Sequence, residues 1–579
     1  MSHGIYKVAA ISPKISVANV TKNCNEIINM IEKAIKEKTD IIVFPELCVC
    51  GATCGDLLLQ EALIEACNDG IRKICQATRD YNGYVVIGAP IEKDNKLFNC
   101  GLVIHSGKVI YNIAKNNLSL NEKRWFSNGK EFEYKNEVNL PFSLVIGENS
   151  FDNMTSDFVI NISAESSEVT KYKYLKKCIE HSDCGYVYAS AGAGESTTDA
   201  VYSGACIIAE NGKIIVEGTR FSFDSEMIIS EINTDNCSAI SKLDNLVVET
   251  VRPNDPHPFI PADKTELTER CEEILEIQST GLGKRMLHTH TKKLVLGISG
   301  GLDSTLALLV AVKTMNKLNY PTENIVCITM PGFGTTDLTY TNACNLVKSV
   351  GASLIEINIK NACLQHFDDI GHDADIHDVT YENTQARERT QILMDYANKI
   401  GALLVGTGDL SELALGWCTY NGDHMSMYGV NASVPKTLMQ HLVRYVADNS
   451  DESTAKILYS VLDTPISPEL LPPDKNGKME QKTENTLGPY EVHDYYLYHF
   501  IRLGTKPEKI LLSAKQAFKG VYTEEELKCW LEIFIRRFFI SQFKRSCSPD
   551  GPKIGSVCLS PRGAWVMPSD ACFDEWMKF

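Results

Sequence analysis

A glycine-rich segment in the second half of the sequence has the composition of a phosphate-binding loop. It reads Ser299-Gly-Gly-Leu-Asp-Ser304 and stands between an apolar run, residues 294–298, and an apolar helical stretch. Two glycines let the backbone approach phosphate oxygens, the start of the next helix presents unpaired N–H groups, and the serines add hydroxyl donors. Because the Gly-Lys-Ser/Thr ending of a Walker loop is absent, transfer of the γ-phosphoryl group is not the expected chemistry.

Charged side chains elsewhere in the second half suit a polyphosphate and an anionic substrate. Asp303 and Glu412 offer hard carboxylate oxygens, the ligands that Mg²⁺ prefers, and Asp409 adds a third. Lys544 and Arg545 supply cations for an anionic substrate. Asp303 and Glu412 are therefore the candidate ligands for Mg²⁺ on a bound polyphosphate.

Short apolar runs that alternate with helical stretches predict an α/β fold for the first half of the chain. We expect strands at residues 7–11, 40–44, 84–88, 101–105, 144–146, 158–162, 186–189 and 205–209. Four prolines between residues 252 and 263 interrupt any regular element and place a domain boundary near residue 260.

The region beyond the prolines has the pattern of a doubly wound parallel sheet. Strands are expected at residues 293–298, 325–330, 353–357 and 403–406, with helices after residues 302, 337 and 384. Such a sheet binds its ligand at the carboxyl ends of the strands. We expect a first domain at 1–235, a linker at 236–265, a second domain at 266–490, and a helical, loop-rich extension at 491–579 that completes the second site.

The glycine-rich segment resembles the loop of the PP-loop family, whose members cleave ATP to AMP and pyrophosphate. Further motifs follow it: Tyr381-Glu-Asn383, Gln385-Ala-Arg387, residues 406–420, residues 429–437 and residues 541–546. With these motifs, essentially the whole chain resembles the long type of NAD synthetase, in which a nitrilase-like glutaminase domain precedes the synthetase domain. The implied fold class is α/β: a nitrilase-like α-β-β-α sandwich followed by a doubly wound parallel-sheet PP-loop ATP pyrophosphatase domain.

The resemblance implies ATP with Mg²⁺ as the cofactor, two groups of binding residues and a reaction. The ATP-binding residues are Gly297, Ile298, Ser299, Gly300, Gly301, Leu302, Asp303, Ser304, Met330 and Thr407. The residues for deamido-NAD are Asn383, Glu412, Trp417, Cys418, Thr419, Tyr420 and Lys544. In the implied reaction, the nicotinate carboxylate of deamido-NAD is adenylated by ATP, and ammonia then displaces AMP to give NAD.

The first domain resembles the nitrilase superfamily, in which a Glu-Lys-Cys triad hydrolyses an amide through a covalent intermediate. Glu46, in Phe-Pro-Glu-Leu, and Lys115, after residues 110–113, match the base and the oxyanion-stabilising lysine. The nucleophile position is occupied by Gly147, in Ile-Gly-Glu-Asn, and a second serine of the family's pattern is replaced by Glu165. Because glycine has no thiol, we expect free ammonia rather than glutamine to be the nitrogen donor.

Three alternatives limit this interpretation. A misplaced nucleophile would leave a fully glutamine-dependent enzyme. The thiols of Cys48, Cys50, Cys54 and Cys184 are candidates for a substitute nucleophile, although a buried structural role is favoured for each. A non-catalytic scaffold is the third alternative, and the intact glycine-rich segment argues against it.

Composition and charge restrict the partners. The formal net charge of −17 disfavours a general nucleic-acid or anionic-membrane surface. The chain shows no signal peptide or apolar run long enough to span a bilayer, and its 20 cysteines suit a reducing compartment, so a cytoplasmic enzyme is expected. The resemblance implies a homo-oligomer.

Overall fold

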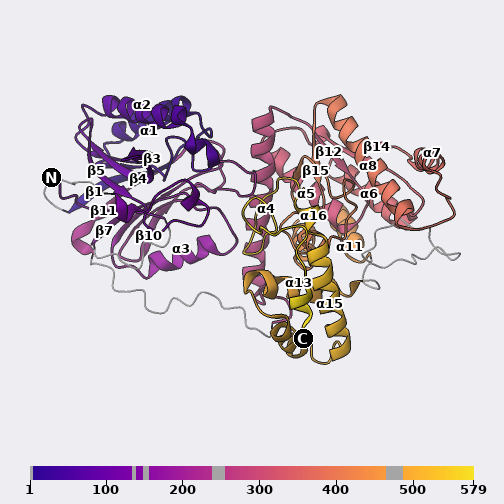
Figure 1. Ribbon diagram of the computed structural model, residues 1–579. Coiled ribbons are helices and arrows are strands. Elements are labelled where there is room, and N and C mark those ends of the chain that lie inside the picture. The colour runs from indigo at the N-terminus through magenta and orange to yellow at the C-terminus, as the bar shows by residue number, and fades with distance from the viewer. Residues whose placement is uncertain (1–3, 133–137, 148–155, 238–254, 465–486) are drawn as a thin grey trace. The chain divides into compact units, whose positions relative to one another are not determined.

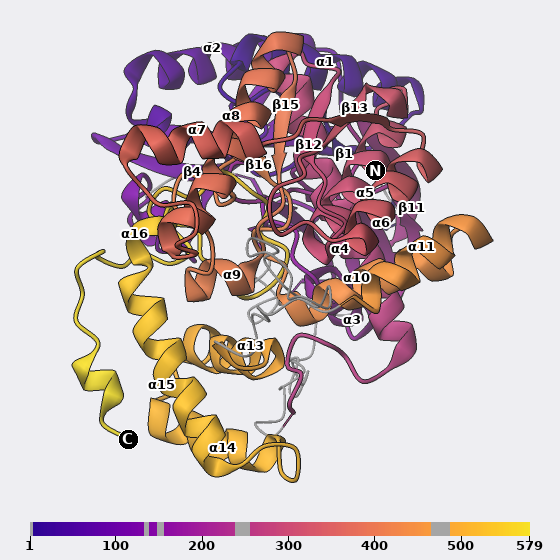
Figure 2. The same ribbon diagram turned by 90° about the vertical axis from the view of Figure 1, so that its right-hand side faces the viewer.

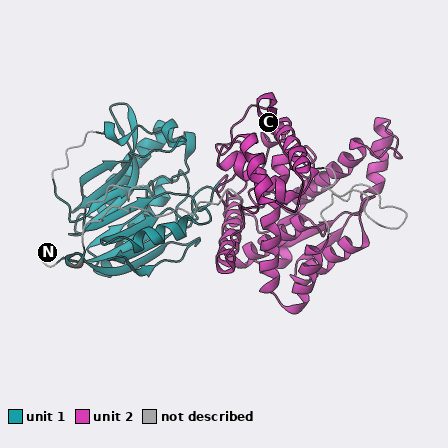
Figure 3. Ribbon diagram, turned by 90° about the horizontal axis from the view of Figure 1, so that it is seen from below, with its two compact units in different colours: residues 1–196, 200–249 teal, residues 197–199, 250–579 magenta. Residues whose placement is uncertain are grey.

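The computed structural model describes residues 4–132, 138–147, 156–237, 255–464 and 487–579. The chain forms two compact units, which Figure 3 shows in different colours. Unit 1 contains residues 1–196 and 200–249, and unit 2 contains residues 197–199 and 250–579. The change of unit at residue 250 lies within the expected linker 236–265. The further division at residue 490 stays a prediction.

Unit 1 contains two β-sheets (Figure 1). The six-stranded sheet has the order β11-β1-β2-β3-β4-β5, and the five-stranded sheet has the order β10-β9-β8-β7-β6. The strands of the first sheet are β1 (Ile5–Ser12), β2 (Ile41–Val43), β3 (Tyr84–Lys93), β4 (Lys96–His105), β5 (Lys108–Ala114) and β11 (Glu226–Asn233). Those of the second are β6 (Ser143–Ile146), β7 (Phe158–Ser163), β8 (Gly185–Ser190), β9 (Cys206–Glu210) and β10 (Lys213–Glu217).

Alternation along the strands sends side chains of the first sheet into two different layers. Val8 and Ala10 of β1 belong to a buried cluster that also contains Ile146 of β6 and Ile160 of β7, so this cluster joins the two sheets. The intervening Ala9 of β1 belongs to a second cluster with side chains of two helices. Those helices are α1 (Val20–Lys36) and α2 (Glu61–Ala77), and α3 (Lys171–Glu180) covers the second sheet.

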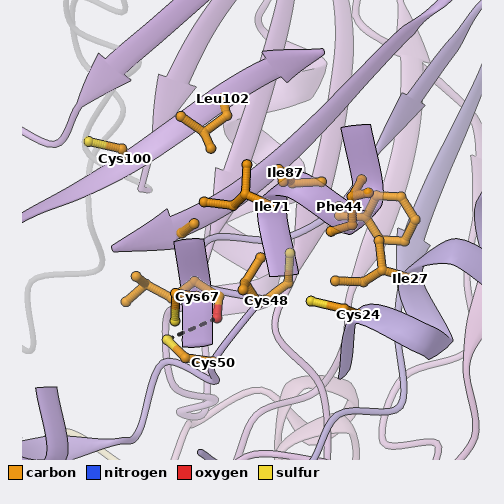
Figure 4. Packing of buried hydrophobic residues seen from close by; sticks show 14 of the residues in the cluster. Cys24, Ile27, Phe44, Cys48, Cys50, Cys67, Ile71, Ile87, Cys100 and Leu102 are labelled. Atoms are coloured by element: carbon orange, nitrogen blue, oxygen red, sulfur yellow. Dashed lines mark hydrogen bonds between the residues drawn. The ribbon is translucent and has the colours of Figure 1, made fainter. Parts of the chain in front are cut away.

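Cysteines occupy part of the layer between the helices and the first sheet. Figure 4 shows Cys24, Cys48 and Cys67 among apolar side chains that include Ile27 and Phe44. All the cysteines in the described ranges are free thiols, and most are buried. The predicted α-β-β-α sandwich is confirmed, although strands β5, β10 and β11 were not expected from the sequence.

Unit 2 is built on a parallel sheet with the order β14-β13-β12-β15-β16. The strands are β12 (Leu294–Gly297), β13 (Ile325–Thr329), β14 (Ser353–Glu356), β15 (Leu403–Gly406) and β16 (Tyr428–Gly429). The order runs outward from β12 to β14 and then reverses, because β15 lies on the other side of β12. This reversal confirms the doubly wound sheet and creates a crevice at the carboxyl ends of β12 and β15.

Helices surround this sheet and form the last part of unit 2. They are α4 (Lys264–Thr289), α5 (Leu302–Lys317), α6 (Asp337–Ser349), α7 (Lys360–Ile370), α8 (Val379–Ile400), α9 (Leu410–Leu415), α10 (Lys436–Asp448) and α11 (Glu452–Leu462). The C-terminal helices are α13 (Tyr490–Leu497), α14 (Pro507–Ala517), α15 (Glu524–Ile540) and α16 (Gln542–Arg545). Helices α13, α14 and α15 pack side by side (Figure 2) around buried aromatic residues such as Phe534 and Phe538.

Helix α8 begins at Val379, earlier than the expected start after residue 384, because the side chain of Asp378 caps it by accepting hydrogen bonds from the backbone N–H groups of Thr380 and Tyr381. Asn383 therefore lies within the first two turns of a helix instead of in a loop. Within the described ranges, no helix is both long and apolar enough to cross a membrane.

Candidate functional site

A cavity of about 810 Å³ opens at the carboxyl ends of the strands of unit 2, a volume in the upper part of the range typical of ligand pockets. Its walls come from the segments after β12, β13 and β15, from α8 and α9, and from the region around α16. The glycine-rich segment lies at one part of the wall, and aromatic and polar side chains lie at another. The crevice predicted from the strand order is therefore the place where most of the expected site residues meet.

The glycine-rich segment is held in a tight turn by its own serines. Ser299 Oγ lies 3.1 Å from Ser304 Oγ and accepts a hydrogen bond from the N–H of Gly301 at 3.2 Å. Gly300 has a φ of +83°, and a Cβ there would lie 2.0 Å from the carbonyl oxygen of Thr339. Position 300 therefore requires glycine for both conformation and space. Helix α5 begins directly afterwards, and Asp303 and Ser304 of its first turn line the cavity.

Most of the residues expected to bind ATP line the cavity: Gly297, Ile298, Ser299, Asp303, Ser304, Met330 and Thr407. Gly300, Gly301 and Leu302 do not line it with their own atoms, and they form the turn and the first residue of α5. Their contact with ATP stays a prediction.

Three carboxylates meet beside the glycine-rich segment. Asp303, Asp409 and Glu412 each offer an oxygen that lies within 4.8 Å of the other two. Asp303 comes from the first turn of α5, while Asp409 caps α9 by accepting a hydrogen bond from the N–H of Glu412 at 2.8 Å. Hard oxygens at this spacing fit Mg²⁺, and the group contains the two expected ligands, Asp303 and Glu412, with Asp409 as the third carboxylate. Binding of the metal stays a prediction.

The ammonium group of Lys436 lies in the middle of this cluster, a position that the sequence did not reveal. Its Nζ is 2.6 Å from Asp303 Oδ1, 2.5 Å from Asp409 Oδ2 and 3.0 Å from Glu412 Oε1. Only 1% of the Lys436 side chain is exposed. The only available signal was the sequence Val-Pro-Lys-Thr before a helical stretch, which places a lysine at the first turn of α10.

Burial, together with repulsion between neighbouring carboxylates, raises the pKa values of Asp409 and Glu412. Burial raises the pKa of Asp409 to about 7, although Lys436 opposes the shift. Burial also raises the pKa of Glu412 well above its usual range, again against the effect of Lys436. Burial alone would lower the pKa of Lys436, but Asp303, Asp409 and Glu412 raise it well above the usual value. A divalent cation would relieve the repulsion that these shifts reflect.

The other part of the cavity wall contains all the residues expected to bind deamido-NAD: Asn383, Glu412, Trp417, Cys418, Thr419, Tyr420 and Lys544. The hydroxyl of Thr419 donates to Asn383 Oδ1 at 2.7 Å, which connects α8 to the segment after α9. The ring of Tyr420 lies 5.4 Å from the rings of His424 and Phe543, and Tyr420 and Phe543 are both partly exposed in the cavity. This part of the wall suits a flat aromatic ligand.

Lys544 and Arg545 differ sharply, although they are adjacent in the sequence. Lys544 Nζ reaches the cavity and donates to the carbonyl oxygens of Gly416 and Cys418 at 2.8 and 2.7 Å. Arg545 is buried and donates to backbone carbonyls of Leu413 and Ala414 at the end of α9. The expectation that Arg545 supplies a cation for the substrate was wrong, because its guanidinium satisfies the C-terminal carbonyls of a short helix.

In unit 1, Glu46 and Lys115 lie together as the resemblance implies. Lys115 Nζ is 2.8 Å from Glu46 Oε1 and 2.8 Å from Glu122 Oε1. Glu46 also accepts hydrogen bonds from Asn99 at 2.6 Å and from the N–H of Ala164 at 2.9 Å. Glu122, which the sequence analysis missed, belongs to a short helical turn without a periodic pattern.

Gly147 faces this lysine. A Cβ at position 147 would lie 3.3 Å from Lys115 Cε and 3.6 Å from its Nζ. The backbone φ of Gly147 is +92°, and its N–H donates to the carbonyl oxygen of Ile162 at 3.0 Å. The position expected for the nucleophile is therefore next to the lysine, and it carries no side chain.

The four thiols considered as substitutes are part of the core. Burial raises the pKa of Cys48 to about 12 and that of Cys184 to about 11. The pKa of Cys50 is also raised, whereas a hydrogen bond with Cys50 lowers the pKa of Cys54. The described structure shows no hydrogen bond from any of the four to Glu46 or Lys115.

Sequence comparisons assign each half of the chain to a known family. A carbon-nitrogen hydrolase family model matches residues 7–149, and an NAD synthase family model matches residues 274–526. A glutamine-dependent NAD(+) synthetase from Mycobacterium leprae is 33% identical over 100% of this chain and 98% of its own length. This chain belongs to the glutamine-dependent NAD(+) synthetase family.

Other relatives and solved structures of this family extend the likeness over nearly the whole chain. A glutamine-dependent NAD(+) synthetase from Aquifex aeolicus is 27% identical, covering 96% of this chain and 97% of its own. The crystal structure of such a synthetase from Cytophaga hutchinsonii superimposes with a TM-score of 0.80 at 21% identity, covering 99% of both chains. The structure of the Acinetobacter baumannii synthetase with ADP gives 0.66 at 23% identity, covering 98% of both. These two structures support the fold.

Proposed function

We propose that unit 2 catalyses the ATP-dependent amidation of deamido-NAD to NAD. The observation that carries the proposal is the single cavity that joins the glycine-rich segment and the carboxylates to the aromatic wall at Tyr420. This arrangement suits a polyphosphate beside a flat ring that bears a carboxylate. Membership of the NAD synthetase family supports the same chemistry.

The reaction proceeds in two displacements. A carboxylate oxygen of deamido-NAD attacks the α-phosphorus of ATP, and pyrophosphate leaves toward the turn formed by Ser299 and Ser304. Ammonia then attacks the carbonyl carbon of the acyl-adenylate, a proton is lost, and AMP leaves. The N–H groups at the start of α5 stabilise the charge on the phosphates. Mg²⁺, held by Asp303, Asp409 and Glu412, would neutralise charge on the leaving pyrophosphate.

The adenylation step has a direct test. In the presence of deamido-NAD, the protein is expected to exchange labelled pyrophosphate into ATP and, with ammonium, to form NAD and AMP in equal amounts. A protein that binds ATP but neither exchanges pyrophosphate nor forms AMP is a non-catalytic scaffold, and this result would overturn the proposal.

We further propose that this chain does not make its own ammonia. The names of its relatives favour glutamine as the donor, which is the alternative interpretation of the sequence. Gly147 supports the proposal, because a thioester cannot form at a residue without a thiol, while Glu46 and Lys115 remain in place beside it. Ammonia then comes from solution or from a separate amidotransferase.

Replacing the missing side chain tests this point. Without ATP, the wild-type protein and Gly147→Ala are expected to release no glutamate from glutamine, whereas Gly147→Cys places a thiol beside Lys115 and is expected to gain measurable hydrolysis. The alanine variant controls for strain from a Cβ at a φ of +92°. Hydrolysis by the wild type at the rate of the cysteine variant would show that another residue is the nucleophile.

A further inference from the structure

The ammonium group of Lys436 forms salt bridges with the three carboxylates that could hold a divalent cation. Its Nζ contacts one oxygen each from Asp303, Asp409 and Glu412 at 2.5 to 3.0 Å. These are the residues whose oxygens lie within 4.8 Å of one another and fit a divalent cation. The ammonium group and the metal therefore require the same carboxylates.

The backbone at the start of α10 is held by hydrogen bonds. The backbone N–H of Lys436 donates to Ser411 Oγ at 2.9 Å, and the next residue, Thr437, donates through its N–H to Asp494 at 3.0 Å. Ser411 is itself bonded to Asp494. The start of α10 is thus fixed, and an exchange of cations must occur by rotation of the four-carbon stem of the lysine.

The large cavity lies next to the ammonium group of Lys436. Asp303 and Glu412 form part of the cavity wall, so Nζ lies directly behind that wall. The ring centroid of Tyr490 lies 5.4 Å from Nζ, and the buried hydroxyl of Tyr490 has no hydrogen-bond partner among the residues that the structure describes. Rotation toward the cavity brings Nζ to the region where the phosphates of the nucleotide are expected.

We propose that Lys436 is a tethered counter-ion that occupies the cation position of the empty site and leaves it when a divalent cation enters. This inference rests on the proposed function. Once displaced by the metal, the ammonium of Lys436 pairs with the phosphates of the nucleotide. When no nucleotide is bound, a divalent cation must displace Lys436 although no phosphate is present to pair with the displaced ammonium. Metal binding is therefore weak without nucleotide and strong with it, which favours entry of the metal and the nucleotide together.

Metal binding without substrates tests the proposal directly. The affinity of the full-length protein for Mn²⁺ is measured by electron paramagnetic resonance, without nucleotide, for the wild type and for Lys436→Gln. Loss of a positive charge that competes for the same oxygens is expected to tighten Mn²⁺ binding at least about tenfold. Lys317→Gln is the matched control, because Lys317 pairs with Glu276 at 2.6 Å outside the cavity wall, and its Mn²⁺ affinity should equal that of the wild type.

Equal or weaker Mn²⁺ binding by Lys436→Gln overturns the proposal. If that variant does not fold, acylation of the wild-type lysines followed by mass spectrometry provides the test. Lys436 should resist the reagent in the metal-free protein and react when Mn²⁺ saturates the site, and continued resistance at saturation contradicts the exchange. Neither measurement uses deamido-NAD or ATP. If the proposed reaction fails, these two measurements still test the exchange of Lys436 for the metal independently.

Discussion

Unit 1 and unit 2 each bury one lysine among carboxylates, but the two lysines face different surroundings. Lys115 contacts Glu46 and Glu122 and faces Gly147, while Lys436 contacts three carboxylates behind the wall of the large cavity. The charged pair of unit 1 lies beside a position, Gly147, that carries no side chain. The comparison shows that a buried lysine and its carboxylates stabilise each other's charges in both units, even where no side chain lies next to them to react.

The largest effect is expected in unit 1, where Lys115→Met removes the partner of a buried carboxylate. Glu46 is only 1% exposed, and loss of its cation is expected to cost about 3–5 kcal/mol of the stability of unit 1. NAD synthesis with ammonium should persist at temperatures at which the variant is folded. Chemical denaturation measures the loss, and the double variant Glu46→Gln/Lys115→Met should recover part of it. A stable single variant would contradict a structural role for the pair.

A single substitution in the glycine-rich segment of unit 2 should lower the rate of the reaction more than the stability of the unit. Gly300→Ala places a Cβ 2.0 Å from the carbonyl oxygen of Thr339 at a positive φ, so the phosphate turn must shift. We expect pyrophosphate exchange to fall about 100-fold, since a small misplacement of phosphate donors is costly. Gly301→Ala is the control, because its Cβ would meet only Ser299 Oγ at 3.4 Å. Equal losses in both variants would exclude a special role for position 300.

The carboxylate cluster should give unit 2 a distinct dependence on pH. The pKa of Asp409 is raised to about 7, so the folded state binds a proton that the unfolded state has already lost above about pH 4. This contribution is therefore present at acid pH and is lost as the pH rises through about 7. Without divalent cations, the melting temperature of the wild type should fall relative to that of Asp409→Asn between pH 5 and pH 8. A constant difference would contradict the shift.

The smallest effect is expected at the aromatic part of the cavity. Thr419→Val keeps the shape of the side chain but removes the hydrogen bond to Asn383. A lost hydrogen bond of this kind costs about 1 kcal/mol, so KM for deamido-NAD should rise about fivefold with little change in kcat. Steady-state kinetics measure both parameters. A fall in kcat at unchanged KM would place Thr419 in the reaction step instead.

The sequence predicted the elements that depend on local patterns. The glycine-rich segment is continuous between a buried strand and an apolar helix, and Gly147 follows a short apolar strand, so both positions could be found by reading along the chain. Lys436 could not be assigned in this way, because its partners Asp303 and Asp409 come from distant segments that meet only in the folded sheet.

Two other side chains show the same limit. Glu122 lies in a turn without periodic signal, so nothing in its neighbourhood indicated that it contacts Lys115. Arg545 was predicted to face the substrate because it follows Lys544, but the chain ends its helix there and buries one of two neighbouring cations against backbone carbonyls. Which of two adjacent residues reaches a cavity depends on the rotation of the helix relative to its neighbours, which sequence alone does not specify.

The most direct test of the central claim compares two nitrogen sources in the same reaction. NAD formation is measured with ATP, Mg²⁺ and deamido-NAD, together with either ammonium or ammonia-free glutamine. The absence of a side chain at Gly147 predicts NAD formation with ammonium and none with glutamine above the blank without nitrogen. Comparable turnover with both sources would contradict the claim that this chain does not make the ammonia that it uses.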